Sequence, residues 1–134
     1  MDLSKQEMTM DNNSLYDKLE SFSNLQQDLD GYEAKSISTT VINNTKFLLD
    51  KLKPLRRWEI FPTNKGIITV EKDLDKTFVI EIEVSESEYI FMFFKYNVEV
   101  GNNCYTIEKG NVYNINELDN LIQELAKLDD KYLV

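Results

Sequence analysis

The 134-residue sequence contains no histidine, one cysteine, two prolines and four isolated glycines. Histidine is the commonest general base and a frequent metal ligand, so its absence excludes the usual Ser-His-Asp and Cys-His nucleophiles and the usual zinc sites. The single cysteine, Cys104, excludes an internal disulfide, and without a histidine to activate its thiol we interpret it as packed or idle. No glycine-rich loop is present to hold a phosphate. We therefore expect no enzyme activity, no catalytic residue, no metal and no cofactor.

Long hydrophobic runs are also absent. The longest apolar stretch, Tyr89 to Phe94, is far shorter than the roughly 20 residues that a membrane-spanning helix needs. No basic and then apolar signal segment opens the chain. We expect a cytoplasmic protein that makes no contact with a membrane.

Positive charge is scarce, because 15 lysines and arginines face 24 acidic residues and the net charge is -9. Surfaces that bind nucleic acid gather basic side chains, and the only basic run here, residues 51–57, follows a predicted helix whose carbonyl end it would stabilise. We therefore expect no direct binding to nucleic acid. The acidic surplus favours a basic protein partner, which it would attract over a distance.

Apolar residues nevertheless make up 42% of the chain, which is enough for one hydrophobic core. Residues 1–13 show no apolar periodicity and are predicted to form a disordered or frayed tail, with Met8 or Met10 as an alternative start. Residues 14–134 are predicted to form a single domain.

Two N-terminal helices are predicted from apolar spacings of three and four residues. The first begins at Ser14, and the second begins at Ser38 or Thr39 as N-cap and ends before Pro54. Their buried faces are predicted to contain Leu15, Leu19, Phe22, Leu25 and Leu29 in the first helix and Val41, Ile42, Thr45, Leu48, Leu49 and Leu52 in the second.

After Pro54 the apolar period falls to two, which predicts antiparallel strands joined by tight turns. The fourth strand is apolar on both faces, so we expect it to be central or covered on both sides by a helix or a partner. A last helix, with Asn116 as N-cap, should pack on the sheet. The predicted fold is α+β, with two N-terminal helices, an antiparallel four- to five-stranded meander and a C-terminal helix. The predicted strands are Trp58–Pro62, Ile67–Glu71, Phe78–Val84, Tyr89–Tyr96 and Cys104–Glu108.

Two short motifs resemble a group of uncharacterised small bacterial proteins. The motifs are Asp30-Gly31-Tyr32-x-Ala34-Lys35-x-Ile37 and Pro62-Thr63-x-x-Gly66-x-Ile68-x-Val70-Glu71. With the shared order of helix, meander and terminal helix, the resemblance covers roughly residues 25–128. Because such proteins often accompany mobile elements and toxin–antitoxin-like gene pairs, the resemblance implies an accessory binding role, antitoxin-like or inhibitory.

Three groups of residues are predicted to bind the partner. They are the loop residues Asp30, Tyr32, Glu33 and Lys35, the strand carboxylates Glu81 and Glu83, and the aromatic and apolar anchors Tyr89, Phe91 and Phe93. The loop has an architectural alternative, in which Gly31 forms a turn and Tyr32 packs between helix and sheet. We interpret Glu81 and Glu83 as a solvated strand face, because nothing in the sequence indicates a pocket that would raise a carboxyl pKa.

Three functions remain open. The first is a non-catalytic protein-binding module that masks a basic partner through its acidic surface. The second is a mimic of nucleic acid that blocks a DNA- or RNA-binding protein, and the third is a homodimeric structural or accessory subunit that associates through the fourth strand. The carboxylates available to a mimic are Asp28, Asp30, Glu33, Asp73, Asp75, Glu81, Glu83, Glu86 and Glu88.

Overall fold

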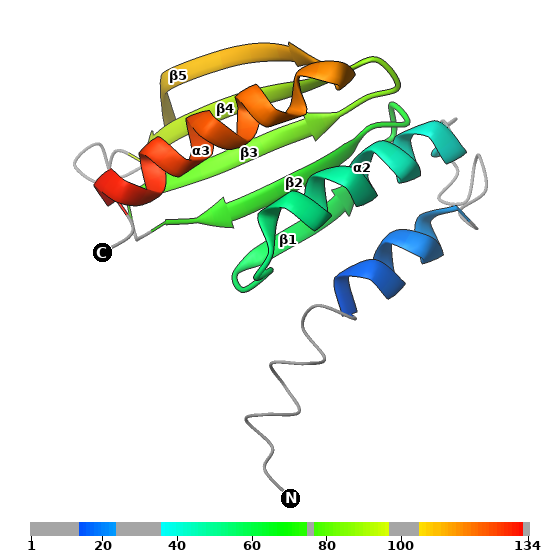
Figure 1. The fold of residues 1–134 in the computed structure, drawn as a ribbon. Helices are drawn as coiled ribbons and strands as arrows, with labels where there is room; N and C mark the ends of the chain where they lie inside the picture. Colours follow the sequence, from blue (N-terminus) through cyan, green and yellow to red (C-terminus); the bar gives the residue numbers. More distant parts are fainter. Residues whose placement is uncertain (1–13, 24–35, 75–76, 97–104, 133–134) are drawn as a thin grey trace, which may run out of the picture.

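The computed structural model describes residues 14–23, 36–74, 77–96 and 105–132. Within them, a helix at residues 14–22 is followed by α2 (Thr39–Leu52), β1 (Trp58–Pro62), β2 (Ile68–Asp73), β3 (Phe78–Val84), β4 (Glu88–Tyr96), β5 (Tyr105–Asn114), the 3-10 helix η2 (Ile115–Glu117) and α3 (Leu118–Tyr132). The predicted α+β fold is confirmed (Figure 1). The predicted tail, the loop residues Asp30, Tyr32, Glu33 and Lys35, and Cys104 lie outside the described residues.

Helix α2 begins and ends where the sequence predicts. The Ser38 hydroxyl accepts a hydrogen bond from the Val41 amide at 3.2 Å, which satisfies one of the unpaired donors of the first turn. The helix ends at Leu52, before Pro54.

The start of the C-terminal helix differs from the prediction. Asn114, and not Asn116, is the N-cap, because a 3-10 turn precedes α3 and continues directly into it. The Asn114 amide donates to Oε1 of Glu117 at 2.9 Å, so the glutamate side chain closes this turn.

The five strands form one antiparallel meander in the order β1-β2-β3-β4-β5. Strand β5 is longer than predicted, since it continues from Tyr105 to Asn114. The second half of β5 is polar, so its sequence lacks the apolar alternation that marks a strand. Its pairing with β4 is also irregular, because the register shifts between Phe93 and Phe94. Backbone pairing with β4 holds this segment in the sheet despite its weak pattern.

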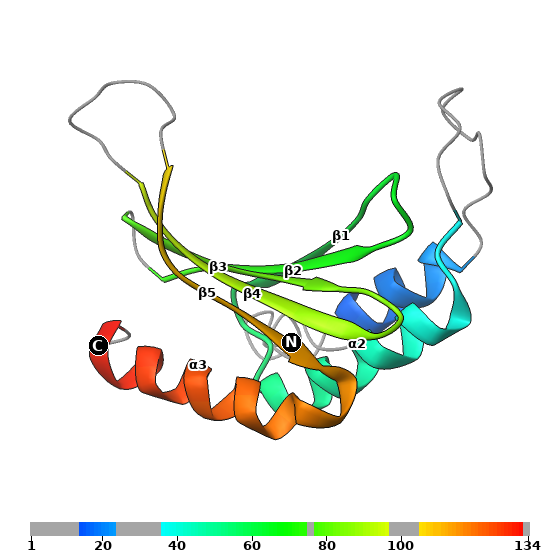
Figure 2. The ribbon, with the colours of Figure 1, turned by 90° about the horizontal axis from the view of Figure 1, so that it is seen from above.

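The described helices all lie against one face of the sheet, and none of them covers the other face (Figure 2). The core lies between the two layers, and its fully buried members include Leu19, Leu48, Leu49, Ile60, Ile68, Ile80, Ile82, Tyr89, Phe91 and Leu121. We call the uncovered side of the sheet the open face.

The assignment of Tyr89, Phe91 and Phe93 as surface anchors needs correction. All three belong to the core, with exposed fractions of 0%, 0% and 3%. The Tyr89 hydroxyl donates to the backbone oxygen of Asn44 in α2 at 2.8 Å, so its polar end is satisfied inside the protein. Because β4 is apolar on both faces, its sequence did not distinguish the face that the helices cover from the face that stays open.

Candidate functional site

A row of three carboxylates crosses the open face. The register pairs Glu59 of β1 with Glu71 of β2, and Glu71 with Glu81 of β3, so the three residues are direct cross-strand neighbours. We call them the carboxylate row. Asp73 and Glu83 extend the same face along β2 and β3, because alternate residues of a strand share a face.

Negative charges accumulate in the carboxylate row, and burial and repulsion raise the pKa of two of its members. Burial raises the pKa of Glu81, and the charges of Glu71 and Glu83 raise it further. Burial also raises the pKa of Glu71, followed by the charges of Asp73 and Glu59. In the described part of the chain, no lysine or arginine forms a salt bridge with the row. Like charges directly opposite in a sheet destabilise it, so the row is a place where an added cation is favoured.

Beside the carboxylate row, β4 carries half-buried apolar side chains and β5 carries exposed ones on the same face. We call this set the apolar strip: Ile90, Met92 and Phe94 of β4 with Tyr105, Ile107 and Val112 of β5. Ile107 and Val112 are each 60% exposed, and Tyr105 is 55% exposed. Large apolar side chains gathered on an uncovered surface beside polar ones are typical of an interaction site.

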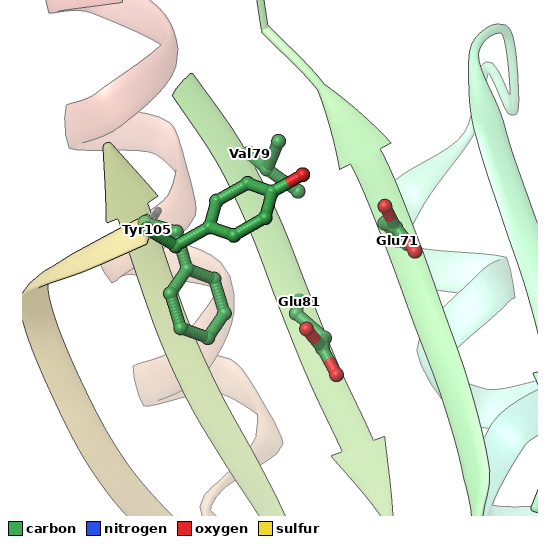
Figure 3. A pocket seen from close by; sticks show the side chains of 5 residues that line it. Glu71, Val79, Glu81 and Tyr105 are labelled. Carbon is green, nitrogen blue, oxygen red and sulfur yellow. The ribbon is translucent and has the colours of Figure 1, made fainter. Parts of the chain in front are cut away.

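A hollow of about 210 Å³ lies where the carboxylate row meets the apolar strip. It is lined by Glu71, Val79, Glu81, Phe94 and Tyr105 (Figure 3). In that view the Tyr105 ring reaches across β3 with its hydroxyl toward Val79 and Glu71. The Phe94 and Tyr105 rings meet edge to face, with centroids 6.0 Å apart. The volume is below the roughly 300 Å³ of the smallest usual drug-sized sites, so the hollow suits one side chain of a larger partner.

The structure changes the interpretation of Glu81 and Glu83. Both lie on the open face, but Glu81 borders a hollow and its pKa is raised, and neither feature is visible in the sequence pattern. Sequence reasoning missed Glu59 and Glu71, which strand pairing brings beside Glu81, and it missed the outward half of β4. The period-two alternation of β2 and β4 was the available signal, but it does not specify which strands are neighbours.

The described residues contain no group of three or more side chains suited to holding a metal ion. Among those same residues, no helix is both long and apolar enough to cross a membrane.

No protein-family model matches the sequence, and searches of the curated proteins and of the solved structures produce no match. The resemblance of the two motifs to the bacterial group therefore stays a prediction.

Proposed function

We propose that the protein is a non-catalytic module that binds a basic protein partner on the open face of its sheet. The observation that supports this proposal is the juxtaposition, on one surface, of an apolar strip that is partly exposed and a carboxylate row that forms no salt bridge with any described residue. The strip gains free energy when it leaves water, at about 25 cal/mol per Å² of apolar area. The row restricts the choice of partner, because only a surface of opposite charge compensates the carboxylates when they lose contact with water.

The size of the open face agrees with a protein partner. Five strands spaced about 4.8 Å apart span about 20 Å, and a seven-residue strand such as β3 extends about 24 Å. The flat area is therefore about 500 Å², and side-chain relief and the rim of the sheet add to it. Standard protein interfaces bury about 800 Å² on each partner, so a single protein domain can cover most of this face.

The wider biological role is also part of the proposal. We propose an antitoxin-like or inhibitory accessory protein that acts in the cytoplasm, as the resemblance of the two motifs implies. The net charge of -9 supports attraction of a basic partner from a distance, and this attraction should weaken as salt is added.

The carboxylate row also favours a second candidate, a mimic of nucleic acid that occupies a DNA- or RNA-binding protein. The apolar strip counts against mimicry, because a sugar–phosphate backbone presents no comparable run of exposed apolar groups. A mimic should displace DNA or RNA from its captured target in proportion to added protein, whereas a partner bound elsewhere would keep its nucleic acid.

Capture of partners by matched variants tests the proposed function. Val112→Asp places a charge in the apolar strip, and Phe47→Asp makes the same kind of change at a residue of α2 that is 58% exposed in the helix layer. A protein captured from source-cell lysate by the wild type should be lost with Val112→Asp and kept with Phe47→Asp. Equal capture by both variants would refute the open face as the binding surface.

The same two variants also test self-association, in a separate experiment. Sedimentation over a concentration series would reveal a homodimer. A dimer that Val112→Asp dissociates and Phe47→Asp preserves would assign the open face to a second copy of this chain, and the proposal of a basic partner would then be wrong.

A further inference from the structure

We infer that the hollow is a subsite for one arginine side chain of the partner. This inference rests on the proposed function, because it names the chemical group that the open face recognises. It follows from the shape of the hollow, from the chemistry of its walls and from the charge that they leave uncompensated.

The walls of the hollow match the two parts of an arginine side chain. Phe94, Tyr105 and Val79 provide an apolar side against which the aliphatic stem can lie and aromatic rings over which a guanidinium group can stack. Glu71 and Glu81 stand directly opposite each other on β2 and β3, with side chains that begin about 5 Å apart. A planar guanidinium group has five donors and can reach both carboxylates at once.

Lysine fits the same walls less well. Its ammonium group is compact and strongly hydrated, so it loses more hydration on entering a half-buried hollow, and it has no planar surface for the aromatic rings. A calcium ion is also a poor match, because it takes six to eight oxygen ligands and the described lining offers only two carboxylates.

The chain does not supply this cation itself within its described residues. Three lysines there lie over aromatic rings, and all three pairs are away from the hollow: Lys18 over Phe61, Lys53 over Tyr16 and Lys72 over Trp58. A guanidinium group in the hollow would reverse the upward pKa shifts of Glu71 and Glu81, because a nearby positive charge favours the ionised carboxylate.

The test is a titration of the full-length protein with N-acetyl-arginine methylamide and, separately, with N-acetyl-lysine methylamide, followed by NMR. The arginine compound should shift the backbone amides of Val79, Glu81 and Phe94 and bind at least fivefold more tightly than the lysine compound. Glu81→Gln should weaken arginine binding at least fivefold, and Glu86→Gln, which alters an exposed carboxylate in the turn between β3 and β4, should not weaken it. The carboxyl pKa of Glu81 should fall on saturation with arginine.

Tyr105→Ala is a second variant, at a side chain that is 55% exposed and so tolerant of change, and it should also weaken arginine binding. Equal binding of the two compounds, or equal loss in Glu81→Gln and Glu86→Gln, would indicate general attraction of cations and overturn the inference. Absence of shifts at the hollow would overturn it too. If Val112→Asp still abolished partner capture in that case, the proposed function would stand without the arginine subsite. If the arginine compound shifted the amides at the hollow but Val112→Asp and Phe47→Asp captured the partner equally, the proposed function would be refuted instead.

Discussion

Replacing Glu81 with glutamine is expected to stabilise the folded protein, because it removes a negative charge that lies close to two other carboxylates on the open face. Glu71 lies directly across from Glu81 on β2, and Glu83 lies two residues further along β3. Both charges, together with burial, raise the pKa of Glu81. Glutamine keeps nearly the same size and shape, so packing in the hollow should not change.

The magnitude follows from the two neighbouring charges. Like charges directly opposite in a sheet cost about 0.2–1 kcal/mol, which applies to Glu71. Two unit charges about 7 Å apart, the spacing of alternate residues on a strand, repel by about 0.6 kcal/mol in water before salt screening, which applies to Glu83. Glu81→Gln should therefore raise the free energy of unfolding by about 0.5–1.5 kcal/mol at pH 7 and low salt. For a chain of this length that raises Tm by about 2–6 °C.

The effect should depend on pH in a defined direction. The pKa of Glu81 in the folded protein is raised above the ordinary value of 4.5, so the folded state binds this proton more tightly than the unfolded state. The stability that the wild type gains from protonation of Glu81 is fully present below pH 4.5, and it is lost as the pH rises through the pKa of Glu81 in the folded state. Wild type and Glu81→Gln should therefore have similar stabilities near pH 4 and separate as the pH rises to 7.

Urea unfolding followed by the fluorescence of Trp58, which is buried in the core, measures the difference. Glu86→Gln is the matched control, because Glu86 is exposed in a turn away from the carboxylate row, and it should change stability by less than about 0.5 kcal/mol. The reasoning is wrong if Glu81→Gln is less stable than wild type, if it equals Glu86→Gln, or if 0.5 M salt does not reduce the difference.

Four further predictions test the contacts that hold the fold behind the open face. Phe91→Ala should lower the free energy of unfolding by about 3–5 kcal/mol, because Phe91 is fully buried. Tyr89→Phe loses a buried hydrogen bond and should lower it by about 0.5–1.5 kcal/mol. Near-zero changes in urea unfolding would contradict the place of both residues in the core. Glu124→Gln removes the 3.0 Å ion pair between Glu124 of α3 and Lys109 of β5, so amide hydrogen exchange in β5 should accelerate relative to β2. If exchange in the two strands changed equally, the ion pair would not be what holds β5 to α3. Ser38→Ala should cost about 1 kcal/mol, whereas no loss would mean that the N-cap hydrogen bond contributes little.

Most of the fold was predictable because it depends on local patterns. The apolar stripe of α2, its cap at Ser38 and its stop before Pro54 follow from the period and the end signals of a helix. The alternation of β3 correctly separated Ile80 and Ile82 from Glu81 and Glu83. Strand β5 was harder to predict, since pairing with β4 and not its own pattern keeps its polar half extended.

The candidate site was only partly predictable. Glu81 and Glu83 were chosen for their charge, and both lie on the open face. The choice of Tyr89, Phe91 and Phe93 failed because β4 presents apolar residues on both faces, and its sequence alone gives no reason to prefer the opposite set. That opposite set includes Phe94, which forms part of the hollow.

The sequence by itself determined the fold class, because its changes of apolar period specify the order of helices and strands. Only the tertiary structure decided which sheet face the helices cover and which charges become neighbours. Glu59, Glu71 and Glu81 are far apart in the chain and form a row only because three strands pair in one register. Local periodicity assigns a side chain to one side of its own strand, whereas register and layer order are set by long-range packing, and the open face is a product of that packing.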